Sequence, residues 1–360
     1  MGGTNGSTAR RRYRQGRRLR HGRRGVVAVI GTLLALLVFF ALFGIFLTQY
    51  VPLWMIDNES LLTAQASTSF ANFKSSVDEQ YALDGPQSYG TPFVISSQGV
   101  PLIAQPTQGS LIFLPNTCPA GLYSKGSTPV GVSGNVTGQF GQPVTPSYCV
   151  FANISESTGP GGAKNFGQQI TTGILELVLP NRYYTPETFY YEDDGVVQSQ
   201  SSGYQVMAFP PPLNLSVLNG NATVTDSFLQ LYGNASTVFG QGSEEVYSHL
   251  KFSNLVTSNG NGLPFNFTFE IGTQYPCAWD PYLYHVVTSS GLTATKSAGP
   301  YYRLVNWFQG QESTPLTSVY SGSCFNSNGA TTILSFTLFN INYAAVYQAG
   351  VQVGMGVGST

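Results

Sequence analysis

The chain has 360 residues, of which 42% are hydrophobic and only 9% are charged, and this length allows one large or two ordinary domains. Nine of its 16 Lys and Arg residues lie in the first 25 positions, which contain no Asp or Glu. Residues 26–360 therefore carry seven basic and 17 acidic side chains, a net charge of −10. The near-neutral whole-chain charge averages two different environments, which excludes any inference of function from the overall isoelectric point.

An apolar segment follows the basic leader without a break. Residues 26–47 are almost purely aliphatic and aromatic, and no charged residue occurs between Gly25 and Asp57. At 1.5 Å per residue this segment is long enough to cross a hydrocarbon core of about 30 Å. A cleaved secretory signal has a shorter apolar region that ends in small residues. The segment is therefore predicted to remain as a membrane-spanning helix.

The arginine-rich leader fixes the expected orientation. An arginine run can bind nucleic acid or anionic lipid, but beside a long apolar segment the positive-inside rule explains it better. Tyr50 and Trp54 follow the apolar segment and suit the outer membrane interface. We therefore predict a cytoplasmic leader over residues 1–25, a transmembrane helix over residues 26–50, an external C-terminal part, and no nucleic-acid partner.

The helical pattern continues beyond the membrane as an amphipathic extension over residues 51–84. Apolar residues recur there at spacings of three and four, which places them on one helical face: Leu62, Ala66, Phe70, Phe73, Val77 and Tyr81. Pro52 is expected to kink the junction, and the segment 84–86, Asp-Gly-Pro, to end the helix. The apolar face must pack on another part of the protein.

From residue 85 onward the sequence has the alternation of half-buried antiparallel strands. In FNFTFEI the apolar members alternate with polar ones: Phe265, Phe267, Phe269 and Ile271. LNLSV alternates in the same way over residues 213–217, and SFTLFNINY changes parity at Phe339, which predicts a β-bulge.

Two dipeptides predict β-hairpins with type I′ turns, Asp194-Gly195 and Asn219-Gly220. The predicted fold class is α+β: one long N-terminal helix followed by a mainly antiparallel, sandwich-like all-β exodomain. We place two β units in it, residues 85–210 and residues 211–360, with the boundary at the triple proline 210–212.

The four cysteines all lie beyond the membrane segment: Cys118, Cys149, Cys277 and Cys324. None has the C-x-x-C spacing of a zinc or redox site, so two disulfides in an oxidising exterior are expected. Of the three possible pairings we favour Cys118–Cys149 with Cys277–Cys324, because each closes a local loop.

Glycosylation sequons also occur throughout the external part, and each is a weak signal by itself. Besides Asn58, the candidate acceptors are Asn135, Asn153, Asn214, Asn221, Asn234 and Asn266. Asn214 and Asn266 fall on the polar sides of predicted strands, where a glycan has room.

The N-terminal sequence RRGVVAVIGTLLALLVFFALFG resembles the class III signal and helix of archaeal type IV pilin-like and archaellin-like proteins. The resemblance covers about 60 residues: the leader, the membrane half and the amphipathic half of the helix. It implies that a prepilin-type peptidase cuts between Gly25 and Val26 on the cytoplasmic face, and that the helix associates with copies of itself or with other pilin-like subunits. The length of the chain suits a minor pilin or an individually anchored surface protein better than a bulk filament subunit.

The sequence offers no catalytic, metal or cofactor site. Only His249 and His285 lie outside, 36 positions apart, and no nucleophile elbow or phosphate-binding loop occurs. The acidic run 192–194, Glu-Asp-Asp, has the residue types of a glycosidase pair or a calcium loop, but its place beside a predicted turn favours a solvated turn. Aromatic clusters such as 182–184 and 189–191 are expected to be cross-strand pairs rather than glycan-stacking platforms. We expect no enzyme.

The sparse charge of the exodomain suggests an acidic or hot setting, because few ionisable groups limit protonation-driven unfolding. The leading hypothesis is a non-enzymatic, pilin-like cell-surface protein with a role in pilus-type assembly or adhesion. The alternative is a single-pass anchored binding or sensor exodomain that keeps its leader and does not polymerise. An extracellular hydrolase is disfavoured because no acid–base or nucleophile constellation is visible.

Overall fold

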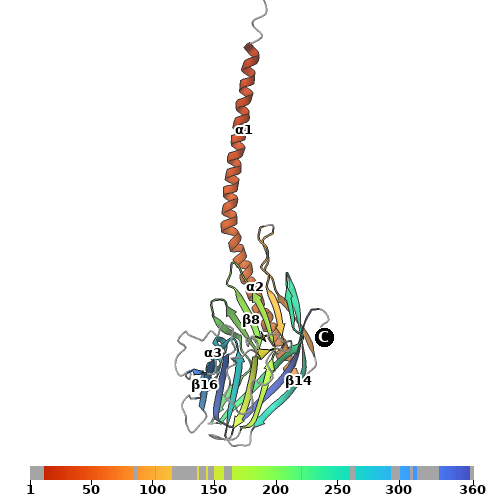
Figure 1. Ribbon diagram of the computed structural model, residues 1–360, viewed down its shortest axis with the longest axis vertical. Helices are drawn as coiled ribbons and strands as arrows, with labels where there is room; N and C mark the ends of the chain where they lie inside the picture. The colour runs from red at the N-terminus through yellow and green to blue at the C-terminus, as the bar shows by residue number, and fades with distance from the viewer. Residues whose placement is uncertain are drawn as a thin grey trace, which may run out of the picture.

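A computed structural model of the protein provides the fold. It describes residues 12–83, 87–101, 103–115, 136–137, 143–144, 150–157, 164–219, 221–259, 264–292, 301–308, 311–313 and 332–356. A long N-terminal rod stands on a β-rich exodomain (Figure 1). The predicted fold class, a long helix followed by a mostly antiparallel β domain, is confirmed.

The rod is one continuous helical run made of α1 (Arg12–Ile45), the π-helical turn η1 (Phe46–Tyr50) and α2 (Val51–Leu83). The π turn lies just before Pro52, where the backbone N–H of Val51 donates to the carbonyl of Phe46. A proline ring clashes with the carbonyl four residues earlier, and a local π turn relieves that clash without breaking the helix. The predicted end of the helix is confirmed at Leu83, while residues 84–86 lie outside the described residues.

Three sheets form most of the exodomain, and their described strands pair antiparallel except for β12 with β19. The first sheet contains, in order, β1 (Ser88–Val94), β14 (Ser243–Asn259), β19 (Tyr343–Met355), β12 (Asn221–Gly233) and β11 (Asn214–Leu218). The second contains β10 (Gln205–Phe209), β9 (Gly195–Gln200), β8 (Glu187–Glu192), β7 (Ile174–Leu179), β2 (Ser110–Leu114) and β13 (Ser236–Phe239).

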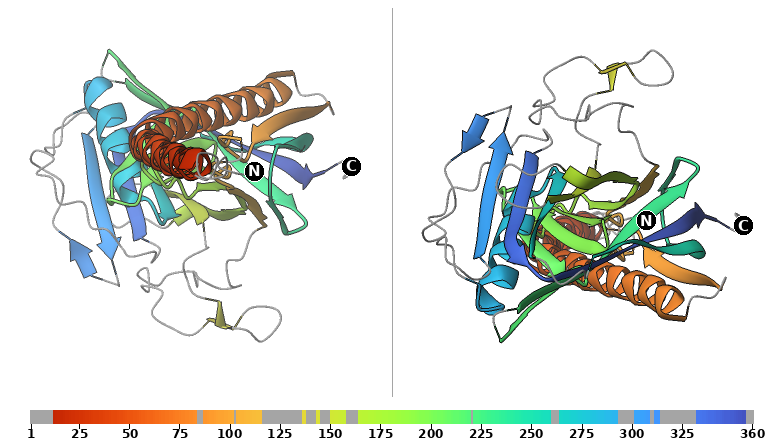
Figure 2. Two further views of the ribbon diagram at one scale, coloured as in Figure 1. Left: turned by 90° about the horizontal axis from the view of Figure 1, so that it is seen from above. Right: turned by 90° about the horizontal axis from the view of Figure 1, so that it is seen from below.

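The third sheet carries the strand predicted from FNFTFEI at its centre. It contains β17 (Gln311–Ser313), β16 (Tyr301–Phe308), β18 (Thr332–Ile341), β15 (Phe265–Thr273), β5 (Val150–Ser157) and β6 (Lys164–Thr172). A separate ribbon pairs β3 (Val136–Thr137) with β4 (Pro143–Val144), and α3 (Pro276–Ser289) follows β15. Seen along the rod, α2 lies at one side of the strands and α3 at another (Figure 2).

The alternation predicted for β15 is confirmed, because its four apolar side chains are all buried. The predicted bulge in β18 is confirmed as well: the β15–β18 register shifts between Phe265 and Phe267, and Asn340 has a φ of 56°. The hairpin at Asn219 forms as predicted, with Leu218 opposite Asn221, and Asn219 has a φ of 52°.

Among the described residues, the apolar core forms two clusters. The helix cluster surrounds α2 and includes Phe73, Tyr191 and Leu231, whereas the α3 cluster includes Trp279 and Val224. Strands β12 and β19 contribute to both, so each cluster takes strands from both sides of the triple proline. The boundary at residues 210–212 stays a prediction.

Candidate functional site

The junction between α2 and the exodomain is where the structure concentrates unusual side chains. The apolar stripe of the helix lies against sheet residues: the Phe70 and Phe93 ring centroids are 5.0 Å apart, and those of Phe73 and Tyr191 are 5.1 Å apart. Phe70 and Phe73 are fully buried. The prediction that the apolar face of residues 51–84 packs on another part of the protein is therefore confirmed. That part is the β domain, and α2 is a core element of it.

A buried carboxylate anchors the end of this contact that lies nearer to the apolar half of the rod. Glu59 Oε2 accepts the backbone N–H groups of Tyr183 and Tyr184 at 2.7 Å each, and Oε1 accepts Thr107 Oγ1 at 2.5 Å and the Arg182 N–H at 3.1 Å. Burial by itself raises the pKa of Glu59, but these hydrogen bonds outweigh it and hold the pKa below its ordinary value. One helical side chain thus fixes two loops of the exodomain to the rod.

Replacing Glu59 tests this anchor. Glu59→Ala is expected to lower the free energy of unfolding by about 3 kcal/mol, because three backbone N–H groups and one hydroxyl lose their acceptor in a buried site. The measurement is chemical unfolding of the full-length chain in detergent micelles. Asp57→Ala, which removes an exposed carboxylate from the same helix, is the matched control, and equal effects of the two variants would contradict the assignment.

At the other end of the junction the acidic turn 192–194 is buried, and the sequence-based prediction for it is wrong. The run 192–194 was expected to be a solvated turn, but Glu192, Asp193 and Asp194 are 0%, 7% and 3% exposed. The hairpin forms with Asp193 and Asp194 as its central residues, at φ values of 45° and 59°, and Gly195 begins the next strand. The turn lies one residue earlier than predicted and packs inside the molecule, between α2 and strand β12.

Gly195 is not a central residue of the turn, and its neighbours leave little room for a side chain. A Cβ atom at this position would lie 3.2 Å from the sulfur of Met207 and 3.3 Å from the Trp279 ring. The Asp194-Gly195 dipeptide therefore predicted the hairpin correctly but not the two residues that form its turn.

Among the described residues, the ammonium group of Lys74 faces the acidic turn. Lys74 Nζ lies 3.0 Å from Asp194 Oδ1 and 3.2 Å from Asp78 Oδ2, and Asp194 also accepts the hydroxyl of Tyr191 at 2.7 Å. Burial raises the pKa of Asp194 to about 7, although Lys74 opposes this shift. These contacts tie the far end of α2 to the hairpin β8–β9.

Three further carboxyl groups in and beside the acidic turn, those of Glu192, Asp193 and Asp226, are buried without an ion pair to any described residue. Glu192 Oε1 accepts Thr273 Oγ1 and Trp279 Nε1, both at 2.5 Å, while its Oε2 has no hydrogen-bond partner among the described residues. Asp226 accepts the Ser227 N–H at 2.9 Å. Burial raises the pKa of Glu192 and of Asp226 to about 7 each, and burial together with the neighbouring carboxylates raises that of Asp193 well above its ordinary value.

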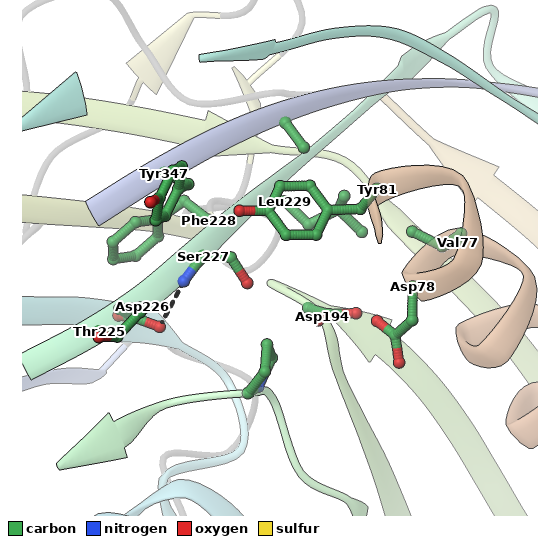
Figure 3. Close-up of a pocket in the computed structure, with 12 residues that line it drawn as sticks. Val77, Asp78, Tyr81, Asp194, Thr225, Asp226, Ser227, Phe228, Leu229 and Tyr347 are labelled. Atoms are coloured by element: carbon green, nitrogen blue, oxygen red, sulfur yellow. Dashed lines mark hydrogen bonds between the residues drawn. The ribbon is translucent and has the colours of Figure 1, made fainter. Parts of the chain in front are cut away.

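A pocket of about 370 Å³ opens between α2, the acidic turn and strands β12 and β19 (Figure 3). Figure 3 shows Asp226 at one side of the pocket and Asp194 and Asp78 at another, with Tyr81 and Tyr347 above them. The walls combine carboxylates with apolar and aromatic surface: Val77, Asp78, Tyr81, Asp194, Pro212, Thr225, Asp226, Ser227, Phe228, Leu229, Tyr347 and Ala349.

Burial favours the protonated form of these carboxyl groups, since it raises the pKa values of Glu192, Asp194 and Asp226 to about 7. Among the described residues no group of three or more His, Cys, Asp or Glu side chains has the geometry to hold a metal ion. His249 lies on β14 and His285 on α3, and neither lines the pocket.

The remaining predicted sites are dispersed over the chain. Gly25 and Val26 lie within α1, and cleavage between them stays a prediction. Cys277 is buried at the start of α3 and is disulfide-bonded, while Cys118, Cys149 and Cys324 lie outside the described residues, so the pairing also stays a prediction.

The sequon asparagines differ in their exposure. Asn214, Asn221 and Asn234 are exposed, and Asn266 is half-buried, with its side chain accepting the backbone N–H of Asn340 at 3.4 Å. Asn135 and the side chain of Asn153 lie outside the described residues. The aromatic cluster 182–184 forms an exposed bend rather than the expected cross-strand pairs.

Sequence reasoning missed Glu59 and Lys74. A signal for Glu59 existed: it precedes Leu62 by three positions and Ala66 by seven, so it lies on the same helical face as the apolar stripe. A carboxylate in phase with a buried face predicts a specific partner. Lys74 and Asp78 have i, i+4 spacing, which by itself indicates only a surface pair.

Comparisons of this chain with protein-family models, with curated proteins and with solved structures found no match.

Proposed function

We propose that the protein is a membrane-anchored, pilin-like surface protein whose continuous helix both holds it in the membrane and carries the β exodomain. One observation carries this proposal: a single rod has two contrasting halves. Its outer half is the core of the exodomain, whereas in residues 28–54 nearly every side chain is exposed and none is buried except Val51. Among the described residues this helix, Ala28–Leu83, contains the one stretch long and apolar enough to cross a membrane.

The two halves support the same mechanical role. An all-round apolar helix is stable in lipid or in a bundle with other such helices. The outer half is fixed to the exodomain by the Phe70–Phe73 stripe, by Glu59 and by Lys74, so displacement of the helix moves the exodomain with it. The resemblance of the leader to class III signals favours cleavage before Val26 and assembly with other pilin-like subunits.

The mass of the native N-terminus tests the proposal. The chain is purified from carbonate-washed membranes of a host that contains a prepilin-type peptidase, and a mature chain that begins at Val26 is the expected result. A chain that retains residues 1–25 would favour the uncleaved anchor instead. Release of the chain from the membrane by carbonate would contradict membrane anchoring in either form.

A second candidate function is that of an anchored binding or sensor exodomain. The pocket between α2 and β12 favours it, since this pocket combines buried carboxylates with aromatic walls. The two candidates share the same anchor and differ in whether the leader is removed.

A further inference from the structure

Beside the rod, the exodomain has a hairpin that runs toward the apolar half of the helix. The chain leaves β1, passes through residues 95–98, turns, and returns through residues 104–108 into β2. Ser96 bridges Gln108 at its base, and Val100 bridges Ala104 near its tip. We name residues 97–107 the tip hairpin.

Two contacts with α2 establish the direction of this hairpin. Ser69 Oγ donates to the carbonyl of Pro92 at 2.8 Å, and Asn58 Nδ2 donates to the carbonyl of Gln98 at 2.9 Å. Gln98 lies six residues after Pro92, whereas its helical partner Asn58 lies eleven residues before Ser69. The chain therefore runs antiparallel to α2, toward the membrane segment, as Figure 1 shows beside α2.

The reach of the tip follows from these contacts. From Gln98 the hairpin continues for about three more residues, which is roughly 10 Å of extended chain. The same length along a helix corresponds to about seven residues. Starting from Asn58, this places the tip beside the turn of the rod between Val51 and Trp54, where we proposed the outer membrane interface. Tyr50 and Trp54 are 53% and 46% exposed at this level.

The composition of the tip suits lipid. Its residues 99–104 read Gly-Val-Pro-Leu-Ile-Ala, and no Asp, Glu, Lys or Arg occurs between Asp84 and Lys125. Ile103 is 40% exposed. Gly99 lets the two arms approach closely, because a Cβ there would lie 2.5 Å from the carbonyl oxygen of Ala104. An uncharged apolar tip beside a membrane helix gains free energy by entering the interface.

Neighbouring side chains extend this surface. Glu59 holds the backbone of the bend 182–184 at the same end of the exodomain, and the Tyr183 and Tyr184 side chains are 44% and 36% exposed. Arg182 is exposed beside them. Tyrosine is favoured at the membrane interface, and the arginine guanidinium is a donor for lipid phosphate.

We propose that the tip hairpin and the bend 182–184 insert into the outer lipid interface, so that the exodomain contacts the membrane at a second place besides the helix. The partner is the lipid surface itself. Insertion at two places holds the exodomain at a fixed tilt against the membrane. This inference rests on the proposed membrane anchoring.

Photo-crosslinking of the full-length chain in phospholipid nanodiscs tests it. A diazirine-bearing leucine analogue is placed at Ile103, at Leu47 in the rod, or at Leu218, and lipid adducts are measured by mass spectrometry. Leu218 is the matched control because it is 73% exposed at the opposite end of the exodomain. Its strand β11 joins the start of β12, which pairs with the start of β19, far from the Ser243 end of β14 that lies beside Val94.

The expected result is a lipid adduct at Ile103 comparable in yield with that at Leu47, and none at Leu218. Adducts at Leu47 without any at Ile103 would overturn the inference and leave the membrane anchor intact. Crosslinks from Ile103 to a second protein chain would also overturn it, in favour of a contact between subunits. Absence of lipid adducts at Leu47 would overturn the anchor and the inference together.

Discussion

Lowering the pH from 8 to 5 is expected to increase the free energy of unfolding of the full-length chain by several kcal/mol. Burial raises the pKa values of Glu192, Asp194 and Asp226 to about 7 each, so the folded chain binds more protons than the unfolded chain in this range. A carboxyl group whose pKa is raised in the folded chain stabilises the fold fully at pH values below its unfolded pKa. This stabilisation is lost as the pH rises through its folded pKa. Each contribution is on the order of 3 kcal/mol.

The gain levels off near pH 4, where the unfolded carboxyl groups are also protonated. Below that pH the effect of Glu59 dominates and has the opposite sign. Because its pKa is lowered in the folded chain, Glu59 stabilises the fold at pH values above its unfolded pKa. This stabilisation is lost as the pH falls through the folded pKa. The measurement is chemical unfolding in detergent micelles at a series of pH values. Such a profile would support the acidic setting, one of the two settings, acidic or hot, that the sparse charge of the exodomain suggests.

Asp226→Asn isolates one of these groups. The asparagine oxygen still accepts the Ser227 N–H, but the buried charge is gone, so this variant is expected to be more stable than the wild type at pH 8 and to have a weaker pH dependence. Asp57→Asn, at an exposed position, is the control and is expected to leave the profile unchanged. A wild-type chain that becomes steadily less stable from pH 8 to 5 would contradict the prediction.

Phe73→Ala is expected to lower the free energy of unfolding by about 3–5 kcal/mol. The side chain is fully buried, and its ring packs edge-on against Tyr191 and Phe93, so truncation leaves a cavity between the helix and the second sheet. The measurement is the same unfolding experiment at pH 5.

Phe239→Ala is the matched control, because this phenylalanine is 72% exposed on β13. Its truncation is expected to change stability by less than about 1 kcal/mol. If the Phe73 variant were as stable as this control, α2 would not be a core element, and the helix could not carry the exodomain as a rigid unit.

The sequence determined the elements with strong local signals. The helix and its end near Asp84 followed from apolar spacing and a Gly-Pro stop, and the strand at Phe265 followed from strict alternation. The bulge after Phe339 followed from a change of parity. These signals are local because backbone geometry repeats every 3.6 or 2 residues, and burial of one face then selects the apolar positions.

Only the tertiary structure decided which acidic side chains are buried and which groups they contact. Nothing near Glu192 or Asp193 in the sequence indicates burial, since the strands and the helix that cover them lie far away along the chain. Likewise Glu59 accepts three of its four hydrogen bonds from a loop more than 120 positions later, and the fourth from Thr107. The pKa of an acidic group depends on its solvation and its neighbours in space, and these exist only after long-range packing is complete.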